Sequence, residues 1–407
     1  MLRPVYCIRF RLAPLQSRLL ASLFVWGLLS SLWACQPESR LVITPNTAPV
    51  STTVTTPANV TVTLPVVYAA SFDGTLYALD TTTGQPRWSF RADTSLQSSP
   101  TVAYGNVYVG GRDLNLYALD ATTGKPRWTA RTSAPIYSSP AAADGRLVVG
   151  SQDGTLYAFD ATTGGRLWTF ATSLGVTGRI YGVYSSPTVV GGLAYVGGQD
   201  NNLYAVDVTN GKLRWLYRTQ QFVLSSPLVA SSVVYVGSED GRVYAVDAAV
   251  GYQRWSFTTG GVVDASPVVA NGLVYVGSAD QYLYALDAQT GALRWRFKTG
   301  GVIYGSAVVA GGVVYVGSRD HRVYALDAQT GALRWSFQTG FDVYSTPVVT
   351  GGSVYLGSND GNVYALNVAT GRPRWTFRTG GAVVASPVLA QPNVTMGQYP
   401  GISGVQP

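Results

Sequence analysis

The chain alternates between short apolar runs and short clusters of turn-forming residues. Between Ser306 and Gly340 the apolar runs are SAVVA, VVYVGS, RVYALD and RWSFQTG, at residues 306–310, 313–318, 322–327 and 334–340. β-Branched and aromatic residues fill these runs, and Gly, Asp, Thr and Gln fill the intervals. This pattern predicts four short antiparallel strands joined by tight turns.

The four-strand unit occurs eight times along the chain. Each copy ends in a tryptophan, and successive tryptophans are 40 residues apart except for one interval of 47. They are Trp88, Trp128, Trp168, Trp215, Trp255, Trp295, Trp335 and Trp375. A fixed period near 40 residues with four strands per repeat is typical of a β-propeller, in which each repeat forms one blade. Since a blade cannot bury its faces alone, the copies must close on each other.

The two ends of the array predict how the ring closes. The array opens on a second-strand run, Val66 to Ser71, and finishes on an unaccompanied first-strand run, Ser386 to Ala390. Pairing of these runs completes one blade and removes the free edge. We therefore predict an all-β fold, an eight-bladed β-propeller of four-stranded antiparallel blades over residues 64–390, closed by its N- and C-terminal strands.

Residues 1–34 have the pattern of an export signal. Basic residues through Arg18 precede sixteen uncharged residues, Leu19 to Ala34, which is shorter than the roughly 20 residues of a membrane span. The next residue is Cys35, and the sequence from Leu32 to Cys35 resembles a bacterial lipoprotein signal in which the cysteine is lipidated. A plain signal peptide and an uncleaved anchor are the alternatives. We predict an exported protein, in the periplasm or at the cell surface, anchored to a membrane through Cys35.

Two further segments flank the array. Residues 35–63 are rich in Thr, Pro and Val and predict an extended tether, and residues 391–407 predict a disordered tail. If Cys7 leaves with the leader, the remaining lipidated cysteine allows no disulfide, catalytic thiolate or Cys-bound metal. Charged residues are 12% of the chain, and without the four leader arginines the net charge falls from +7 to +3. No block of like charge indicates nucleic-acid binding, and we expect a monomeric domain.

The strings YALDATTGKPRW, at residues 117–128, and YALDAQTGALRW, at 284–295 and 324–335, resemble the tryptophan-docking repeat of quinoprotein-type propellers. The resemblance covers all eight copies, and we interpret the eight tryptophans as structural wedges between blades. It implies two very different functions. Pyrroloquinoline-quinone dehydrogenases are enzymes, whereas the BamB family of outer-membrane barrel-assembly lipoproteins is a noncatalytic scaffold.

The residue types favour the scaffold. The dehydrogenases often have adjacent cysteines beside the cofactor and supply a Glu/Asn/Asp calcium site, and this sequence shows no such cysteine pair or acid cluster. His321 is the only histidine, so Ser/His/Asp catalysis or a multi-His zinc site has little to work with. We predict no catalytic residues, no metal ligands and no cofactor. Binding of pyrroloquinoline quinone by an enzyme or sensor is the first alternative, and a surface module for polysaccharide or peptide is the second.

The one long interval lies between Trp168 and Ser185, where the connection is seven residues longer than its counterparts. In the BamB family a longer connection at this place carries hydrophobic residues and an Arg that meet the barrel-assembly partner. By position, the resemblance implies partner binding through Leu174, Arg179, Ile180 and Tyr181. The partner implied is an envelope protein of the outer-membrane barrel assembly machinery. The repeats here are more uniform than in that family.

Function in a ring of repeats is expected where the copies differ. The residue before each first-strand motif should surround the mouth of the central channel, because the innermost strand starts there. Besides Leu224 and Val384, these residues are Gln97, Tyr137, Tyr184, Asp264, Tyr304 and Tyr344. Four tyrosines, an acid and an amide suit a flat ligand or an extended peptide. Packing of a narrow entrance is the alternative.

Turns between second and third strands are expected on the same face. Leu114, Asn201, Gln281 and His321 stand where the other copies have a Gly after the turn's Asp. With the long connection, these substitutions point to this face as the binding face, and ordinary turn variation is the alternative. We interpret the recurring Asp as a turn cap rather than a metal ligand. Arg precedes seven of the eight tryptophans on the outermost strands, where charge discourages edge-to-edge pairing.

Overall fold

The computed structural model describes residues 65–172 and 182–390. These ranges contain 32 β-strands and no α-helix. Accordingly, none of the described segments is a candidate membrane-spanning helix. The predicted export signal, Cys35, the tether, the tail and the loop residues Leu174, Arg179, Ile180 and Tyr181 lie outside the described residues.

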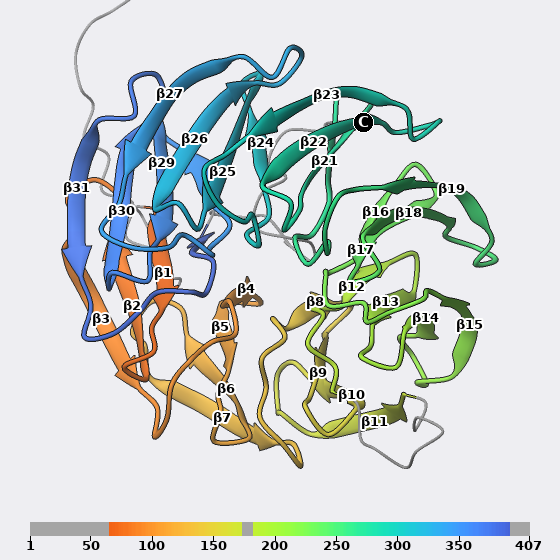
Figure 1. Ribbon diagram of the computed structural model, residues 1–407. Coiled ribbons are helices and arrows are strands. Elements are labelled where there is room, and N and C mark those ends of the chain that lie inside the picture. Colours follow the sequence, from red (N-terminus) through yellow and green to blue (C-terminus); the bar gives the residue numbers. More distant parts are fainter. Residues whose placement is uncertain (1–64, 173–181, 391–407) are drawn as a thin grey trace, which may run out of the picture. The chain divides into compact units, whose positions relative to one another are not determined.

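The strands form eight antiparallel sheets of four, arranged as blades around a central axis (Figure 1). The order below runs from the axis outward. Blade 1 contains β32 (Val388–Ala390), β1 (Val66–Ala70), β2 (Thr75–Asp80) and β3 (Pro86–Arg91). Blade 2 contains β4 (Thr101–Ala103), β5 (Asn106–Gly110), β6 (Asn115–Asp120) and β7 (Pro126–Arg131). Blade 3 contains β8 (Ala141–Ala143), β9 (Arg146–Gly150), β10 (Thr155–Asp160) and β11 (Arg166–Ala171). Blade 4 contains β12 (Thr188–Val190), β13 (Leu193–Gly197), β14 (Asn202–Asp207) and β15 (Leu213–Arg218).

The second half of the ring repeats this order. Blade 5 contains β16 (Leu228–Ala230), β17 (Val233–Ser238), β18 (Arg242–Asp247) and β19 (Gln253–Thr258). Blade 6 contains β20 (Val268–Ala270), β21 (Leu273–Gly277), β22 (Tyr282–Asp287) and β23 (Leu293–Lys298). Blade 7 contains β24 (Val308–Ala310), β25 (Val313–Ser318), β26 (Arg322–Asp327) and β27 (Leu333–Gln338). Blade 8 contains β28 (Val348–Thr350), β29 (Ser353–Gly357), β30 (Asn362–Asn367) and β31 (Pro373–Arg378).

The hydrophobic core lies between the blades. The two middle strands of each blade are almost entirely buried, and most apolar clusters join residues of two neighbouring blades. One such cluster joins Tyr68 and Leu76 of blade 1 to Val107 and Leu119 of blade 2. The outermost strands alternate exposed and partly buried residues because only one of their faces packs on a neighbour.

The predicted eight-bladed architecture and its closure are confirmed. Strand β1 pairs with β32, with Val66 opposite Ala390 and Tyr68 opposite Val388. The innermost strands are shorter than the sequence predicts, and β24 starts at Val308 rather than at Ser306. The Ser306 hydroxyl accepts a hydrogen bond from the Ser266 amide of the preceding blade. The first residues of the innermost run therefore bond sideways around the axis instead of to the second strand.

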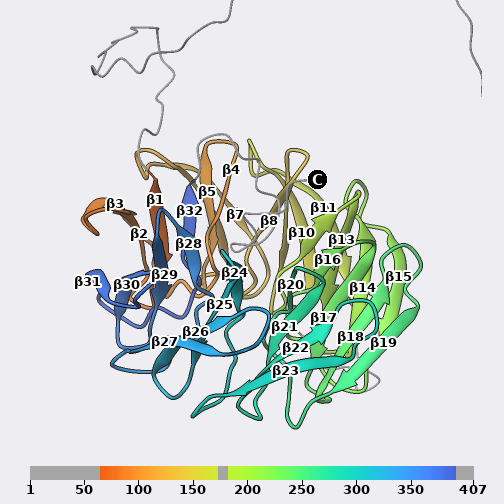
Figure 2. The same ribbon diagram turned by 90° about the horizontal axis from the view of Figure 1, so that it is seen from above.

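The connections of the blades lie on two opposite faces (Figure 2). The mouth face carries the turns between second and third strands and the connections from each blade to the next. The chain-end face carries the turns between first and second strands and between third and fourth strands. Described residues start at Pro65 and end at Ala390 on the chain-end face, and the Pro65 carbonyl accepts a 3.0 Å hydrogen bond from the Thr81 hydroxyl. The mouth face therefore carries neither end of the propeller.

Candidate functional site

Each tryptophan packs against a turn glycine of the next blade. A Cβ at Gly124 would lie 2.5 Å from Cε3 of Trp88, and Trp88 Nε1 donates a 3.1 Å hydrogen bond to the Ala121 carbonyl. The same contact joins Trp375 of blade 8 to Gly84 of blade 1. All eight tryptophans make it, namely Trp88, Trp128, Trp168, Trp215, Trp255, Trp295, Trp335 and Trp375. They connect the turns into one ring on the chain-end side.

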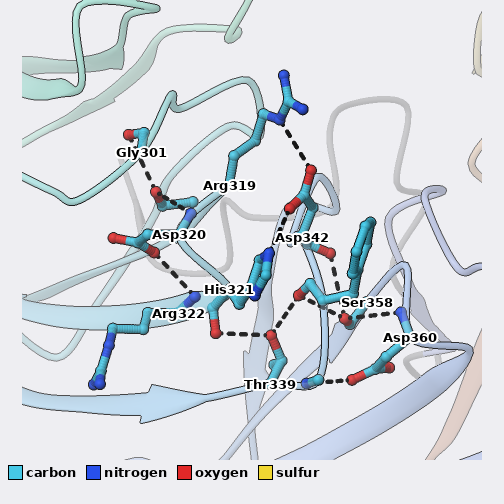
Figure 3. A network of polar contacts seen from close by, with 12 residues as sticks. Gly301, Arg319, Asp320, His321, Arg322, Thr339, Asp342, Ser358 and Asp360 are labelled. Carbon is cyan, nitrogen blue, oxygen red and sulfur yellow. Dashed lines mark hydrogen bonds and ion pairs between the residues drawn. The ribbon is translucent and has the colours of Figure 1, made fainter.

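The recurring turn aspartates bond within their own turns and to the end of the preceding blade. Asp320 accepts hydrogen bonds from the Arg322 amide at 3.0 Å, the Tyr324 hydroxyl at 2.6 Å and the Gly300 amide at 2.7 Å. These contacts tie the turn of blade 7 to the connection that enters it from blade 6, and Figure 3 shows the bond from the Arg322 amide. Within the described part of the chain, no three His, Cys, Asp or Glu residues are grouped as a metal site would require.

A second set of aspartates neutralises most of the arginines that precede the tryptophans. Arg87 contacts Asp80 at 2.6 Å, and five other blades contain the same pair. The hydrogen bond from Arg87 is the main reason that the pKa of Asp80 falls to about 2. Blade 8 has Asn367 at the aspartate position, and Arg374 makes no ion pair with a described residue. Six of the seven arginines that precede the tryptophans are therefore neutralised within their own blades.

The four mouth tyrosines form two stacked pairs. The Tyr137 and Tyr184 rings lie 5.1 Å apart at 19°, and the Tyr304 and Tyr344 rings lie 5.9 Å apart at 9°. One pair precedes blades 3 and 4 and the other precedes blades 7 and 8, so the pairs face each other across the eight-bladed ring. Rings this close leave no room for a planar molecule between them. A flat ligand would have to lie across a pair.

Asp264 is the acidic member of the mouth. Its Oδ1 is buried and has no hydrogen-bond partner among the described residues. Burial, and secondarily the charge of Glu239, raises the pKa of Asp264 to about 6. Burial also raises the pKa of Glu239. Blades 5 and 6 therefore place two acids side by side at one sector of the mouth, where they are more easily protonated than in water.

A polar cluster that the sequence did not predict lies on the mouth face between blades 7 and 8 (Figure 3). Its centre is Asp342, whose side chain is only 7% exposed. The carboxylate contacts Arg319 Nε at 2.9 Å and His321 Nε2 at 3.1 Å. The imidazole of His321 stacks on Phe341 at 5.1 Å, and the Arg319 guanidinium lies 6.0 Å from the Tyr344 ring centre. One predicted residue, His321, thus belongs to a larger group with an aromatic pair beside it.

The other predicted residues of this face do not join that cluster. Leu114 and Gln281 take the same positive φ as His321, at 73° and 76°, but stand on blades 2 and 6. Gln97 donates a long 3.5 Å hydrogen bond to the Ser95 hydroxyl. Arg319, which the sequence analysis did not predict, occupies the position just after the second strand of its blade. When the eight copies are aligned, this position varies from copy to copy. In chain order its residues are Phe72, Arg112, Gln152, Gln199, Glu239, Ala279, Arg319 and Asn359.

The described residues do not fit a calcium-bound quinone. Such a cofactor needs a group of acidic and amide ligands around the metal, and most of the described acids are spread around the ring in turns, where they accept hydrogen bonds from nearby backbone amides. Asp264 and Glu239 are joined by no third described acid, and the carboxylate of Asp342 is held by Arg319 and His321. The mouth instead contains two stacked tyrosine pairs, the acids Asp264 and Glu239, and the Arg319 guanidinium held by the buried carboxylate of Asp342.

Several solved structures are similar to this chain. BamB from Moraxella catarrhalis is 21% identical, covers 73% of this chain and 91% of its own, and superposes with a TM-score of 0.64. The computationally designed Ika8 protein is 18% identical, with 71% and 90% coverage and a TM-score of 0.63. The quinohemoprotein alcohol dehydrogenase ADHIIG from Pseudomonas putida HK5 is 17% identical, with 79% and 69% coverage and a TM-score of 0.62. At these identities the likeness concerns the fold alone.

Sequence families give a more specific result. A search of curated proteins gives no match. A family model described as outer membrane protein assembly factor BamB matches residues 46–114, 72–223, 219–302 and 298–404. These matches span nearly the whole repeat array, which is the part that forms the closed ring. The chain therefore belongs to the family of the outer membrane protein assembly factor BamB.

Proposed function

We propose that this protein is a noncatalytic binding scaffold of the cell envelope, which holds a partner protein on its mouth face and acts in outer membrane protein assembly. The family match supports the cellular role, because that family is described by outer membrane protein assembly. In this proposal residues 1–34 direct export, Cys35 carries a lipid, and residues 35–63 tether the propeller to the membrane.

One observation supports the mouth face as the partner-binding surface. In a ring of nearly identical blades, aromatic pairs and a buried charge cluster depart from the repeat at the mouth, while both propeller ends leave on the opposite face. The departures include two stacked tyrosine pairs and the Asp342 cluster. Aromatic and arginine side chains dominate the energetics of protein interfaces. A polypeptide, with its mixture of apolar and charged groups, matches this mixed surface.

The partner contacts are assigned to two groups of residues. The first is the long connection, with Leu174, Arg179, Ile180 and Tyr181. The second is the mouth, with Tyr137, Tyr184, Tyr304 and Tyr344 as aromatic contacts and with Arg319, Asp264 and Gln97 as polar contacts. Tyr184 follows the long connection in the sequence, so the Tyr137–Tyr184 pair is the part of the mouth nearest to that connection along the chain.

Crosslinked pull-down from membranes of the native host tests the proposal. The baits are the full lipoprotein, a variant with residues 174–182 cut to the length of the other connections, and Tyr304→Ser/Tyr344→Ser. The control is Leu333→Ser, which removes an exposed apolar side chain of blade 7 far from the mouth turns. Capture of an outer-membrane assembly protein by the parent and the control, but not by the other two, supports the proposal. Equal capture by all four baits refutes the mouth assignment, and capture of no envelope protein refutes the function.

A quinone-binding function is the second candidate, because the paired tyrosine rings give a flat surface that a planar ligand can cover. Absorbance titration with pyrroloquinoline quinone and calcium separates the two. Micromolar binding that is lost in Tyr304→Ser/Tyr344→Ser would favour the quinone, whereas the scaffold proposal expects no such binding.

A further inference from the structure

The chain-end face holds an excess of positive charge. Its turns and adjoining strand ends carry twelve Arg or Lys and eight Asp, although the described residues together have a net charge of only +2. Six of the aspartates are each paired with the Arg seven residues later and are therefore already neutralised. The two others, Asp144 and Asp160, lie on blade 3. Six cations of this face make no ion pair with a described residue, namely Lys125, Arg146, Arg166, Lys212, Arg372 and Arg374.

Three of these cations stand on consecutive blades. Lys125, Arg166 and Lys212 occupy the turns between third and fourth strands, or the residue just after, in blades 2, 3 and 4. All three are exposed, and none makes an ion pair with a described residue. Their side chains are therefore free to meet an external anion.

The next blade continues this arc with apolar side chains. In blade 5 the same turn carries Val250 and Tyr252, which are 54% and 76% exposed. The other seven copies have Thr or Asn at the position of Val250 and no aromatic residue at the position of Tyr252. Exposure of two large apolar side chains side by side costs solubility unless something covers them.

The four turns form a continuous surface. Trp128 of blade 2 packs on Gly164 of the blade 3 turn, and Trp168 packs on Gly211 of the blade 4 turn. Trp215 then packs on Gly251, which lies between Val250 and Tyr252. Because each contact fixes one turn against the outer strand of the preceding blade, the cations and the apolar pair keep a fixed relation to one another.

We propose that the chain-end face of blades 2 to 5 docks on an anionic lipid surface. Lys125, Arg166 and Lys212 contact the headgroups, and Val250 and Tyr252 enter the interfacial layer, where tyrosine is enriched in membrane proteins. Basic side chains at a membrane surface act through charges of the lipid leaflet and are screened by salt. This role goes beyond the proposed partner binding, since it uses the opposite face.

The position of the chain ends favours lipid over other polyanions. The described chain enters this face at Pro65, and thirty residues of preceding sequence lead back to Cys35 and the apolar stretch Leu19–Ala34. An extended segment of that length spans at most about 100 Å, so a membrane that holds the leader is within reach of this face. An exposed Tyr–Val pair also suits an apolar layer better than it suits a nucleic acid or an acidic polysaccharide.

Vesicle co-sedimentation tests the proposal with residues 36–407, whose propeller is closed by its own strands β1 and β32. The vesicles are phosphatidylcholine with or without phosphatidylglycerol. The test variants are Lys125→Gln/Arg166→Gln/Lys212→Gln and Val250→Thr/Tyr252→Gln. Each replacement residue occurs at the equivalent position of another blade. The matched control is Arg91→Gln/Arg131→Gln/Arg378→Gln, which removes the same charge from the mouth face, where blade 7 has Gln338.

The expected result is salt-sensitive binding to vesicles with phosphatidylglycerol only. At about fivefold per cation, the triple test variant loses about a hundredfold in partitioning, while the control stays close to the parent. The Val250/Tyr252 variant also binds more weakly. Equal loss in the control, binding independent of phosphatidylglycerol, or no binding overturns the proposal. Binding to tRNA or heparin as tight as to vesicles assigns the face to soluble polyanions and also overturns it. Pull-down on the mouth face is a separate readout, so either proposal can fail alone.

Discussion

The docking of Trp88 on Gly124 can be isolated with two glycine substitutions in blade 2. Gly124 and Gly105 have nearly the same backbone conformation, with φ of 70° and 73°. A Cβ at Gly124 would lie 2.5 Å from the Trp88 ring, whereas a Cβ at Gly105 would meet nothing within 4 Å. Gly124→Ala and Gly105→Ala therefore share the backbone cost and differ in the contact with tryptophan.

The magnitudes follow from these two terms. An alanine at positive φ costs about 1–2 kcal/mol, which is the whole effect expected for Gly105→Ala. At Gly124 the new methyl also pushes the Trp88 indole out of its packing contact with the turn, and overpacking of this kind costs about 1–3 kcal/mol more. The upper limit is loss of the whole contact, since truncation of a buried Trp costs roughly 3–5 kcal/mol. Gly124→Ala should therefore destabilise the propeller by about 2–5 kcal/mol.

Chemical denaturation followed by tryptophan fluorescence measures both effects, and a double variant supplies the decisive control. In a Trp88→Ala background the methyl of Gly124→Ala no longer meets a ring, so its cost should fall to that of Gly105→Ala. If Gly124→Ala is no more harmful than Gly105→Ala in the parent, the tryptophan does not wedge the blades as described. Equal costs of Gly124→Ala with and without Trp88 would refute the argument in the same way.

Two further predictions concern charge. The folded-state pKa of Asp80 lies below its unfolded value of about 3.9, so its pair stabilises the fold above that pH and the contribution is lost as the pH falls toward 2. Asn367→Asp should create a seventh such pair with Arg374, raising the free energy of unfolding by up to about 1 kcal/mol at pH 7 and by nothing at pH 2 in urea denaturation. The folded-state pKa of Asp264, about 6, lies above its unfolded value, so ionisation of this buried acid removes stability as the pH rises through that range. Asp264→Asn should be more stable than the parent by about 1–3 kcal/mol at pH 7 and equal to it at about pH 3, and a pH-independent difference would contradict this reasoning.

Part of the candidate site could be predicted from the sequence. The tyrosines of the mouth were found because the eight copies can be aligned and Tyr137, Tyr184, Tyr304 and Tyr344 stand in one column. Arg319 also stands at a variable position of the repeat, but the alignment of the copies does not identify it as a site residue. Its role depends on the carboxylate of Asp342, 23 residues away. Asp342 is recognisable only as a residue that replaces a small or apolar one in the connection.

By itself, the sequence determined the number of blades, their strand order and the closure of the ring. Those features depend on local patterns of apolar and turn residues that recur with a fixed period, and on an unpaired strand at each end. The tertiary structure alone decided that Tyr137 stacks on Tyr184, that Asp342 holds Arg319 and His321, and that six of the seven arginines before the tryptophans are neutralised by aspartates. These outcomes depend on the direction of side chains across the gap between neighbouring blades, and that direction is set by the curvature of the closed ring rather than by any local repeat.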